Sequence, residues 1–264
     1  MTGLLPRTLD IYLTSRCNLE CAYCSSKGIT AKDLALPLAS VLKAVDLYVS
    51  RLGPGSRDAA VNFTGGEPLL AYDTLRDSIL RIRRRYPRLR LTAMTNGVLL
   101  SPDRAAFLLE QRVMLTVSLD GEKRPNDSFR KFRRPRASSS YDAVTSRLGR
   151  LTPEQIAAMS AGVTVTRKTL AAMPQTLSCL RRLGFRLLCL NFDMFEPWTG
   201  EGLERLAASL KVLRSSSGRQ PRDLFFETVA GCDRLSQLTR VLVFSPDGRF
   251  FPCHAACKIG RAHV

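Results

Sequence analysis

Short apolar runs alternate with longer amphipathic stretches along most of the chain. The short runs have the length and composition of buried strands, and we predict strands at Leu9–Leu13, Ala60–Phe63, Arg90–Met94, Val113–Val117, Gly162–Thr166 and Leu187–Phe192. Helical periodicity predicts helices near residues 33–52, 72–86, 102–111, 140–150, 172–183 and 201–215. Strands that alternate with helices indicate right-handed βαβ units around a parallel sheet. We therefore expect an α/β fold, a partial (β/α)6 barrel of the TIM type over residues 8–215.

The pattern changes toward the end of the chain. Residues 214–222 (RSSSGRQPR) have the composition of a linker, and two short strands follow them, Val241–Phe244 and Arg249–Phe251, around a Ser-Pro-Asp-Gly turn. The hairpin predicts that a small second domain begins within residues 223–257. Since an isolated hairpin is marginally stable in water, we expect an unpaired strand edge and an uncovered phenylalanine there.

The last seven residues, 258–264 (KIGRAHV), resemble the translation of a common sequencing adapter. We interpret them as a non-native tail. On this interpretation the natural chain continues past Cys257.

The formal charge of +17 is carried largely by arginine, which supplies 32 of the 40 basic residues. Such a charge attracts nucleic acid or acidic peptide, but biased composition and solvated helix faces explain it more simply. We therefore do not expect nucleic acid as a partner. No apolar run has the length of a membrane helix and the N-terminus lacks a signal-peptide core, so we expect a cytoplasmic protein without a membrane partner.

Three of the eight cysteines, Cys17, Cys21 and Cys24, lie within eight residues just after the first predicted strand. A chain of this size without a secretory signal favours metal-binding or catalytic thiols over disulfides. Structural zinc needs four ligands, and a cubane iron–sulfur cluster is ordinarily held by four cysteines. Three cysteines leave one iron open to a chelating molecule. A zinc-binding interaction protein is the non-enzymatic alternative.

The spacing CxxxCxxC after the first strand resembles the signature of the radical S-adenosylmethionine (SAM) superfamily. The resemblance implies a [4Fe–4S] cluster on Cys17, Cys21 and Cys24, with SAM chelated at the open iron. In that family the reduced cluster passes one electron to SAM, which yields a 5′-deoxyadenosyl radical that abstracts hydrogen from the substrate. Tyr23 matches an aromatic position that packs near the adenine.

Three further motifs each follow a predicted strand: GGEP at residues 65–68, TNG at residues 95–97 and SLDG at residues 118–121. In a parallel sheet these positions share the edge at which functional groups gather. The resemblance implies that GGEP binds the SAM ammonium through Glu67, that TNG lines the cofactor pocket and that the serine of SLDG contacts SAM. The implied SAM-binding residues are Tyr23, Gly65, Gly66, Glu67, Pro68, Asn96, Ser118, Asp120 and Arg130.

Two of these assignments leave alternatives open. Asp120 either faces the SAM ribose or orients its own loop. Asp127 and Arg130 form a D-x-x-R pattern found in the same relatives, and Arg130 is suited to bidentate pairing with a carboxylate. Asn191, Asp193 and Glu196 follow the sixth strand and are weaker candidates for contacts, whereas Cys179 and Cys189 are expected to be buried structural thiols.

A second cysteine group comprises Cys232, Cys253 and Cys257. The spacing Cys232–Gly248–Cys253 resembles the opening of the SPASM or twitch domain, which holds auxiliary iron–sulfur clusters in peptide and protein maturases. The later cysteines of that domain are absent from this chain, so an auxiliary cluster is expected only in a full-length protein.

The sequence is thus identified as a radical SAM enzyme of the SPASM type that modifies a peptide or protein side chain, as in maturation of ribosomal peptides or sulfatases. The resemblance implies a peptide or protein substrate and an electron donor such as flavodoxin or ferredoxin. Alternatives are the radical SAM GTP cyclase of molybdenum-cofactor synthesis and an RNA-modifying radical SAM enzyme. The catalytic residue, the substrate and the oligomeric state are not indicated.

Overall fold

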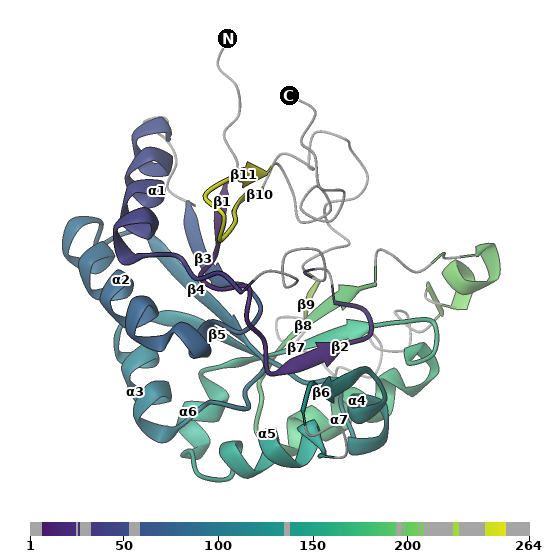
Figure 1. Cartoon of the computed structure of the whole chain (residues 1–264). Coiled ribbons are helices and arrows are strands. Elements are labelled where there is room, and N and C mark those ends of the chain that lie inside the picture. The colour runs from purple at the N-terminus through teal and green to yellow at the C-terminus, as the bar shows by residue number, and fades with distance from the viewer. Residues whose placement is uncertain are drawn as a thin grey trace.

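The structure is a computed structural model, which describes residues 7–24, 26, 33–52, 59–134, 138–193, 197, 199–205, 207–208, 224–226 and 241–251. Its centre is a curved sheet of parallel strands in which each neighbour follows the last along the chain (Figure 1). These central strands are β1 (Thr8–Tyr12), β3 (Ala60–Thr64), β4 (Arg90–Thr95), β5 (Val113–Ser118), β7 (Ser160–Val165) and β8 (Leu187–Phe192).

Helices connect the strands and cover the convex side of the sheet (Figure 1). The main helices are α1 (Leu38–Arg51), α2 (Tyr72–Arg85), α3 (Pro102–Glu110), α5 (Ser140–Leu148) and α7 (Met173–Arg182). Shorter elements are α4 (Lys123–Phe129), α6 (Pro153–Ala157) and the 3-10 turns η1 (Pro68–Ala71) and η2 (Leu170–Ala172). In the described part of the chain no helix is long and apolar enough to cross a membrane.

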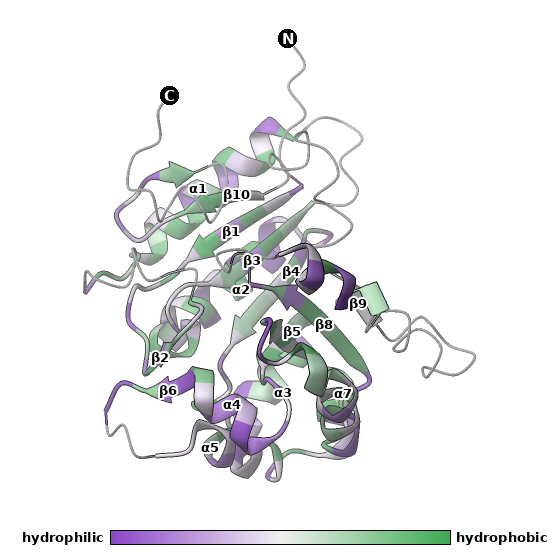
Figure 2. Ribbon diagram, turned by 90° about the vertical axis from the view of Figure 1, so that its right-hand side faces the viewer, coloured by the Kyte–Doolittle hydropathy of each residue, from purple (hydrophilic) through white to green (hydrophobic). Residues whose placement is uncertain are grey.

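The two faces of the sheet differ in character because strand side chains alternate between them. Leu9, Ile11 and Phe63 are fully buried in the main hydrophobic cluster, which includes the apolar faces of α1, α2 and α3. On the opposite, concave face, Asp10 accepts a hydrogen bond from Asn62 Nδ2 (3.1 Å). Small polar side chains such as Thr92 and Thr116 continue along this face together with Met94 and Met114. Figure 2 shows hydrophobic and hydrophilic positions mixed along β5, whereas β8 is largely hydrophobic.

The predicted α/β architecture is confirmed. All six predicted strands and five of the predicted helices are present, mostly with bounds within two residues of the expected ones. Helix α1 begins at Leu38 rather than near residue 33, because residues 34–36 are extended and bond to the loop after β1, with Leu36 N donating to Leu13 O (2.8 Å). The last predicted helix is described only at residues 200–205 and 207–208.

The expectation of a hairpin without partner strands is wrong, but the expected uncovered phenylalanine is present as Phe250. β10 (Val241–Phe244) pairs in parallel with β1, from Thr8↔Val241 to Ile11↔Phe244, and β11 (Phe250–Phe251) pairs antiparallel with β10. A further strand, β9 (Leu224–Phe226), pairs in parallel with β8. Eight consecutive parallel strands therefore form the described sheet, with β11 and β9 at its two ends.

This pairing has a simple physical cause: an unpaired edge of β1 offers backbone donors and acceptors that a distant segment can satisfy. In the hairpin, Phe251 is 4% exposed and Phe250 is 36% exposed. The division of the chain into residues 8–215, 223–257 and 258–264 stays a prediction.

The basic run at the end of α2 has a structural role. Arg83 donates to three backbone carbonyls, those of Leu89 (2.6 Å), Gln111 (2.9 Å) and Arg112 (3.0 Å). It thereby ties α2 to the turns that lead into β4 and β5. Its neighbours Arg81 and Arg84 are exposed, as expected for a solvated helix face.

Candidate functional site

The loops that follow β1, β3, β4 and β5 meet at the carboxyl end of the sheet, as parallel strands require. The loop after β1 contains a short strand, β2 (Leu19–Cys21), which pairs antiparallel with β6 (Arg130–Phe132). In this pairing Cys21 lies opposite Arg130. The sequence pattern did not predict this two-stranded sheet, because three-residue strands have no measurable periodicity. It brings the cysteine loop to the D-x-x-R segment.

Cys17, Cys21 and Cys24 are all partly exposed and form no disulfide. Burial raises the pKa of Cys17 to about 12, and the negative charges of Glu67, Cys21 and Cys24 raise it further, against a hydrogen bond from Leu19 N (3.4 Å). All three cysteines belong to the one short segment that follows β1.

Among the described residues, no group of three His, Cys, Asp or Glu side chains is close enough to hold a single metal ion. Thiolates of a cubane cluster each bind a different iron and need not converge on one point. Three thiols leave one ligand position open, which fits a cubane cluster with one open iron better than a four-ligand zinc site.

The two glycines of GGEP let the loop after β3 lie directly against the backbone of the cysteine loop. Gly66 N donates to Thr14 O (2.8 Å) and Glu67 N donates to Arg16 O (2.8 Å). A Cβ on Gly66 would lie 2.1 Å from Arg16 O, and Gly65 has a φ of 140°. Close backbone packing is thus a sufficient reason for both glycines.

The carboxylate of Glu67 is buried, at 1% exposure, and accepts three hydrogen bonds. Oε1 accepts from Leu69 N (3.0 Å) and Thr95 Oγ1 (2.6 Å), and Oε2 accepts from Asn96 N (2.7 Å). A carboxylate has about four acceptor positions, so one on Oε2 is left. Pro68, also buried, begins the turn η1 that Glu67 caps.

Burial raises the pKa of Glu67 above its ordinary value, and the hydrogen bonds from Thr95, Asn96 and Leu69 oppose the rise. For an acid with a raised pKa, the folded state is favoured most below the ordinary carboxyl pKa. That contribution is lost as the pH rises through the higher value. A cation beside Oε2 would therefore stabilise the ionised form at neutral pH.

Asn96 links the TNG loop to the cysteine loop. Its Oδ1 accepts from Val98 N (3.1 Å), its Nδ2 donates to Asn18 Oδ1 (2.7 Å), and the same Nδ2 lies 3.9 Å from Cys17 Sγ. Asn18 was not singled out from the sequence. Its position between two predicted ligands was the available signal.

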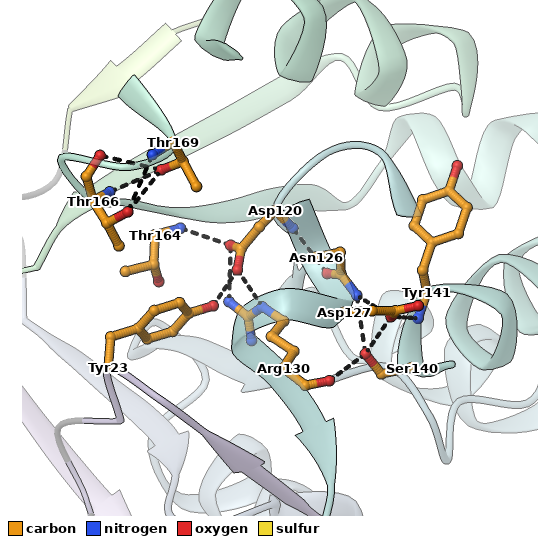
Figure 3. A network of polar contacts seen from close by, with 10 residues as sticks. All are labelled: Tyr23, Asp120, Asn126, Asp127, Arg130, Ser140, Tyr141, Thr164, Thr166 and Thr169. Carbon is orange, nitrogen blue, oxygen red and sulfur yellow. Dashed lines mark hydrogen bonds and ion pairs between the residues drawn. The ribbon is translucent and has the colours of Figure 1, made fainter. Parts of the chain in front are cut away.

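Asp120 and Arg130 form a buried bidentate ion pair (Figure 3). Arg130 Nε donates to Asp120 Oδ2 (2.9 Å) and Nη2 to Oδ1 (3.2 Å), and their side chains are 8% and 1% exposed. Asp120 also accepts from Thr164 N (2.9 Å) and from the hydroxyl of Tyr23. The guanidinium carbon of Arg130 lies 5.3 Å from the centre of the Tyr23 ring, which stacks on Phe129. This geometry supports the loop-orienting interpretation of Asp120.

The two residues of the D-x-x-R pattern, Asp127 and Arg130, contact different parts of the structure (Figure 3). Asp127 accepts from Ser139 Oγ (2.6 Å) and Tyr141 N (2.9 Å) at the start of α5. Burial by itself would raise the pKa of Asp127, but the hydrogen bonds from these donors outweigh burial, so the pKa lies below its ordinary value. Asn126 was not predicted from the sequence. Its Nδ2 donates to Asp127 Oδ1 (3.2 Å) and its Oδ1 accepts from Asp120 N (3.2 Å). Asn126 therefore connects Asp127 with the ion pair of Asp120 and Arg130.

Other predicted residues have less defined surroundings. Ser118 is half-buried at the end of β5, and Asp193 N donates to Val165 O (2.9 Å) after β8. Cys179 is buried as expected, whereas Cys189 is only half-buried. Glu196, Cys232, Cys253 and Cys257 lie outside the described residues.

The sequence profile of the Radical SAM superfamily matches residues 11–163. A GTP 3′,8-cyclase of Rhodococcus opacus is 31% identical over 226 residues, which are 80% of this chain and 59% of the relative. A GTP 3′,8-cyclase of Paenarthrobacter nicotinovorans is 35% identical over 115 residues, 42% of this chain and 31% of the relative. The chain thus spans from about a third to three-fifths of the length of these two relatives.

Two solved structures share the fold. One, "Native anSMEcpe with bound AdoMet", has a TM-score of 0.73 at 19% identity and covers 95% of this chain and 75% of its own. Streptococcus suis SuiB bound to precursor peptide SuiA has a TM-score of 0.73 at 13% identity, with 98% and 62% coverage. The superfamily match supports a [4Fe–4S] cluster and S-adenosylmethionine as cofactors.

The close approach at Gly66 yields a prediction. Gly66→Ala should lower the free energy of unfolding by roughly 1–3 kcal/mol, because its Cβ overlaps a backbone oxygen that cannot move independently. Gly149→Ala is the control, because Gly149 has a φ of −62° and its Cβ would meet nothing closer than 3.4 Å. It should be neutral or slightly stabilising. Urea unfolding measures both; equal effects would contradict the packing argument.

The ion pair yields a second prediction. Asp120→Asn leaves the Arg130 charge buried without a counterion, so we expect a loss of about 3–5 kcal/mol. The control is Asp142→Asn, which breaks an exposed ion pair with Lys123. The side chains of Lys123 and Asp142 are 58% and 55% exposed, so the loss should be about 1 kcal/mol or less. Thermal and urea unfolding of the two variants test this; similar losses would show that Asp120 is not a structural centre.

Proposed function

Since the chain belongs to the radical SAM superfamily, we propose that Cys17, Cys21 and Cys24 hold its [4Fe–4S] cluster and that the chain cleaves SAM reductively. The observation that carries the proposal is the placement of the three partly exposed thiols on one loop. That loop is hydrogen-bonded to the GGEP and TNG segments, and its own residue Tyr23 is hydrogen-bonded to Asp120 of SLDG. When bound, the cofactors supply a carbon-centred radical that abstracts hydrogen.

The chain's own groups suit the zwitterionic end of SAM. Glu67 Oε2 has an acceptor position for the ammonium, and the anionic carboxylate would compensate its charge. The remaining proposed contacts surround this point at the ends of β3, β4 and β5: Gly65, Gly66, Pro68, Asn96 and Ser118.

Tyr23, Asp120 and Arg130 act differently in this proposal. Asp120 and Arg130 satisfy each other, so their task is to position Tyr23 next to the cofactor rather than to bind SAM directly. The Tyr23 hydroxyl donates to Asp120, and Phe129 and Arg130 lie against the ring, so the ring is held in one orientation. In this proposal the adenine packs against the ring surface that these neighbours leave uncovered. Burial raises the pKa of Tyr23 well above its ordinary value, which keeps the hydroxyl protonated as a donor.

For the substrate, we propose a peptide or protein side chain. The SLDG and D-x-x-R motifs resemble those of peptide-modifying enzymes, and their residues Asp120 and Arg130 hold the cysteine loop in place. The neighbour SuiB was solved with a precursor peptide, and anSMEcpe with the Cp18Cys peptide. The concave face carries partly exposed polar groups, among them Asn62, Thr92 and Thr116. They bond to neighbouring side chains of the sheet and keep further hydrogen-bonding capacity for a peptide backbone. An auxiliary cluster that includes Cys232, Cys253 and Cys257 is proposed only for a full-length protein, and this chain is proposed to hold one cluster.

A second candidate is cyclisation of GTP. Its specific support is the 31% identity over 80% of this chain with a protein named GTP 3′,8-cyclase, well above the identity to the peptide-binding neighbours. Both candidates use the same cysteine loop. They differ in the molecule that lies against the concave face.

The cluster assignment predicts that anaerobically reconstituted protein binds about four irons per chain and forms 5′-deoxyadenosine from SAM when reduced. The triple variant Cys17→Ala, Cys21→Ala, Cys24→Ala should do neither, because every proposed ligand is removed. Cys179→Ala changes a buried thiol outside the loop and should retain both properties. Iron analysis and chromatography measure the outcome; SAM cleavage by the triple variant would refute the assignment.

The substrate assignment predicts which molecule donates hydrogen. With a deuterated cysteine-rich peptide, 5′-deoxyadenosine should acquire deuterium and the peptide should change mass. With deuterated GTP under the same conditions, 5′-deoxyadenosine should acquire no deuterium and GTP should not be converted. Mass spectrometry of both reactions decides between the two candidates, because transfer from GTP alone would overturn the peptide assignment in favour of cyclisation.

A further inference from the structure

The two-stranded sheet β2–β6 has two chemically different faces. Leu19 is 3% exposed and Arg130 is 7% exposed, and both lie on the inner face, where Arg130 reaches Asp120. The alternate residues Glu20 and Lys131 are exposed on the outer face and lie opposite each other. Cys21, which is paired with Arg130, therefore belongs to the inner face of the strand pair, and the outer face presents charged side chains.

The outer face has an excess of positive charge directly beside the cysteine loop. After Lys131 the chain continues with Arg133 and Arg134, both exposed, and Arg133 N donates to Asn18 O (3.0 Å). Asn18 follows Cys17, so this hydrogen bond places the basic segment one strand away from a proposed cluster ligand. We call Lys131, Arg133 and Arg134 the basic ridge; the acidic residue of the β2–β6 outer face is Glu20.

We propose that the basic ridge is the docking surface for a small acidic one-electron carrier protein that reduces the cluster. This inference rests on the proposed function of Cys17, Cys21 and Cys24. In each turnover the carrier would lose one electron and the cluster would gain it for transfer to the SAM sulfonium. No other reductant is required.

Two physical arguments select this partner. Electron transfer slows exponentially with distance, so the carrier must dock close to the cluster, and the ridge is bonded to the cluster-binding loop itself. Opposite charge on two surfaces accelerates encounter and orients it. A peptide substrate has a different requirement, because it must reach the side of the loop that faces Asp120 and the concave sheet.

The other dense basic run supplies a matched control. Arg81 and Arg84 on α2 and Arg88 after it are equally exposed. They lie at the end of α2 that leads into β4, opposite the edge where the cysteine loop follows β1 (Figure 1). Reversing charge there changes the net charge of the protein without touching the ridge.

The test compares two variants of the full chain. The ridge variant is Lys131→Gln, Arg133→Glu, Arg134→Glu, with glutamine at 131 to avoid two acidic residues opposite each other at Glu20. The control variant is Arg81→Glu, Arg84→Glu, Arg88→Gln, which alters the charge by the same amount. The probe is a flavodoxin, and calorimetry at low and high salt measures its binding to each cluster-free chain.

We expect the ridge variant to bind flavodoxin about tenfold or more weakly at low salt, with little remaining salt dependence, while the control stays close to the parent chain. After reconstitution, SAM cleavage driven by reduced flavodoxin should fall similarly in the ridge variant. Cleavage driven by dithionite should be unchanged in all three proteins, because a small reductant needs no docking surface.

Several results would overturn the docking surface: no salt-sensitive flavodoxin binding by the parent chain, equal weakening in the control, or flavodoxin binding unaffected by the ridge substitutions. Normal flavodoxin binding with lost peptide binding would assign the ridge to the substrate instead. Failure of the parent chain to cleave SAM with dithionite would refute the proposed function separately, since the binding experiment uses no cluster.

Discussion

The buried carboxylate of Glu67 is the contact on which the arrangement of the site depends. Its three acceptor bonds fix the TNG loop against the turn after β3, and its own backbone N–H donates to Arg16 O just before Cys17. One residue thus ties together the loops after β1, β3 and β4. A buried carboxylate is costly unless its oxygens are satisfied, and here the protein supplies the donors itself.

The buried ion pair of Asp120 and Arg130 fixes the other side of the cysteine loop. Such pairs add little stability relative to well-packed apolar residues, but removal of one partner is expensive. The benefit here is geometric: Arg130 is on β6, which pairs with β2, and Asp120 also holds the Tyr23 hydroxyl and Thr164 N. The loop that carries the cysteines is therefore held by the sheet on one edge and by this network on the other.

The contrast between the faces of the main sheet explains how one domain combines stability with a reaction surface. The convex face is packed by helices around fully buried residues such as Leu9 and Phe63. The concave face carries partly exposed small polar residues where a filled barrel would have large branched ones. Hydrogen bonds such as Asn62 to Asp10 satisfy several of these groups within the sheet, and strand alternation places Met94 and Met114 on the same face.

The sequence by itself determined the six central strands, five of the helices and the order of motifs along one sheet edge, because these follow from local periodicity and from the geometry of parallel strands. It also placed Cys17, Cys21 and Cys24 on a loop at that edge. Only the tertiary structure decided that β10 returns to pair with β1 and that Cys21 lies opposite Arg130, since such pairings join segments far apart in the chain and leave no periodic trace. Likewise, the choice of Asp120 as the partner of Arg130 is a matter of distance and burial, which residue types alone do not encode.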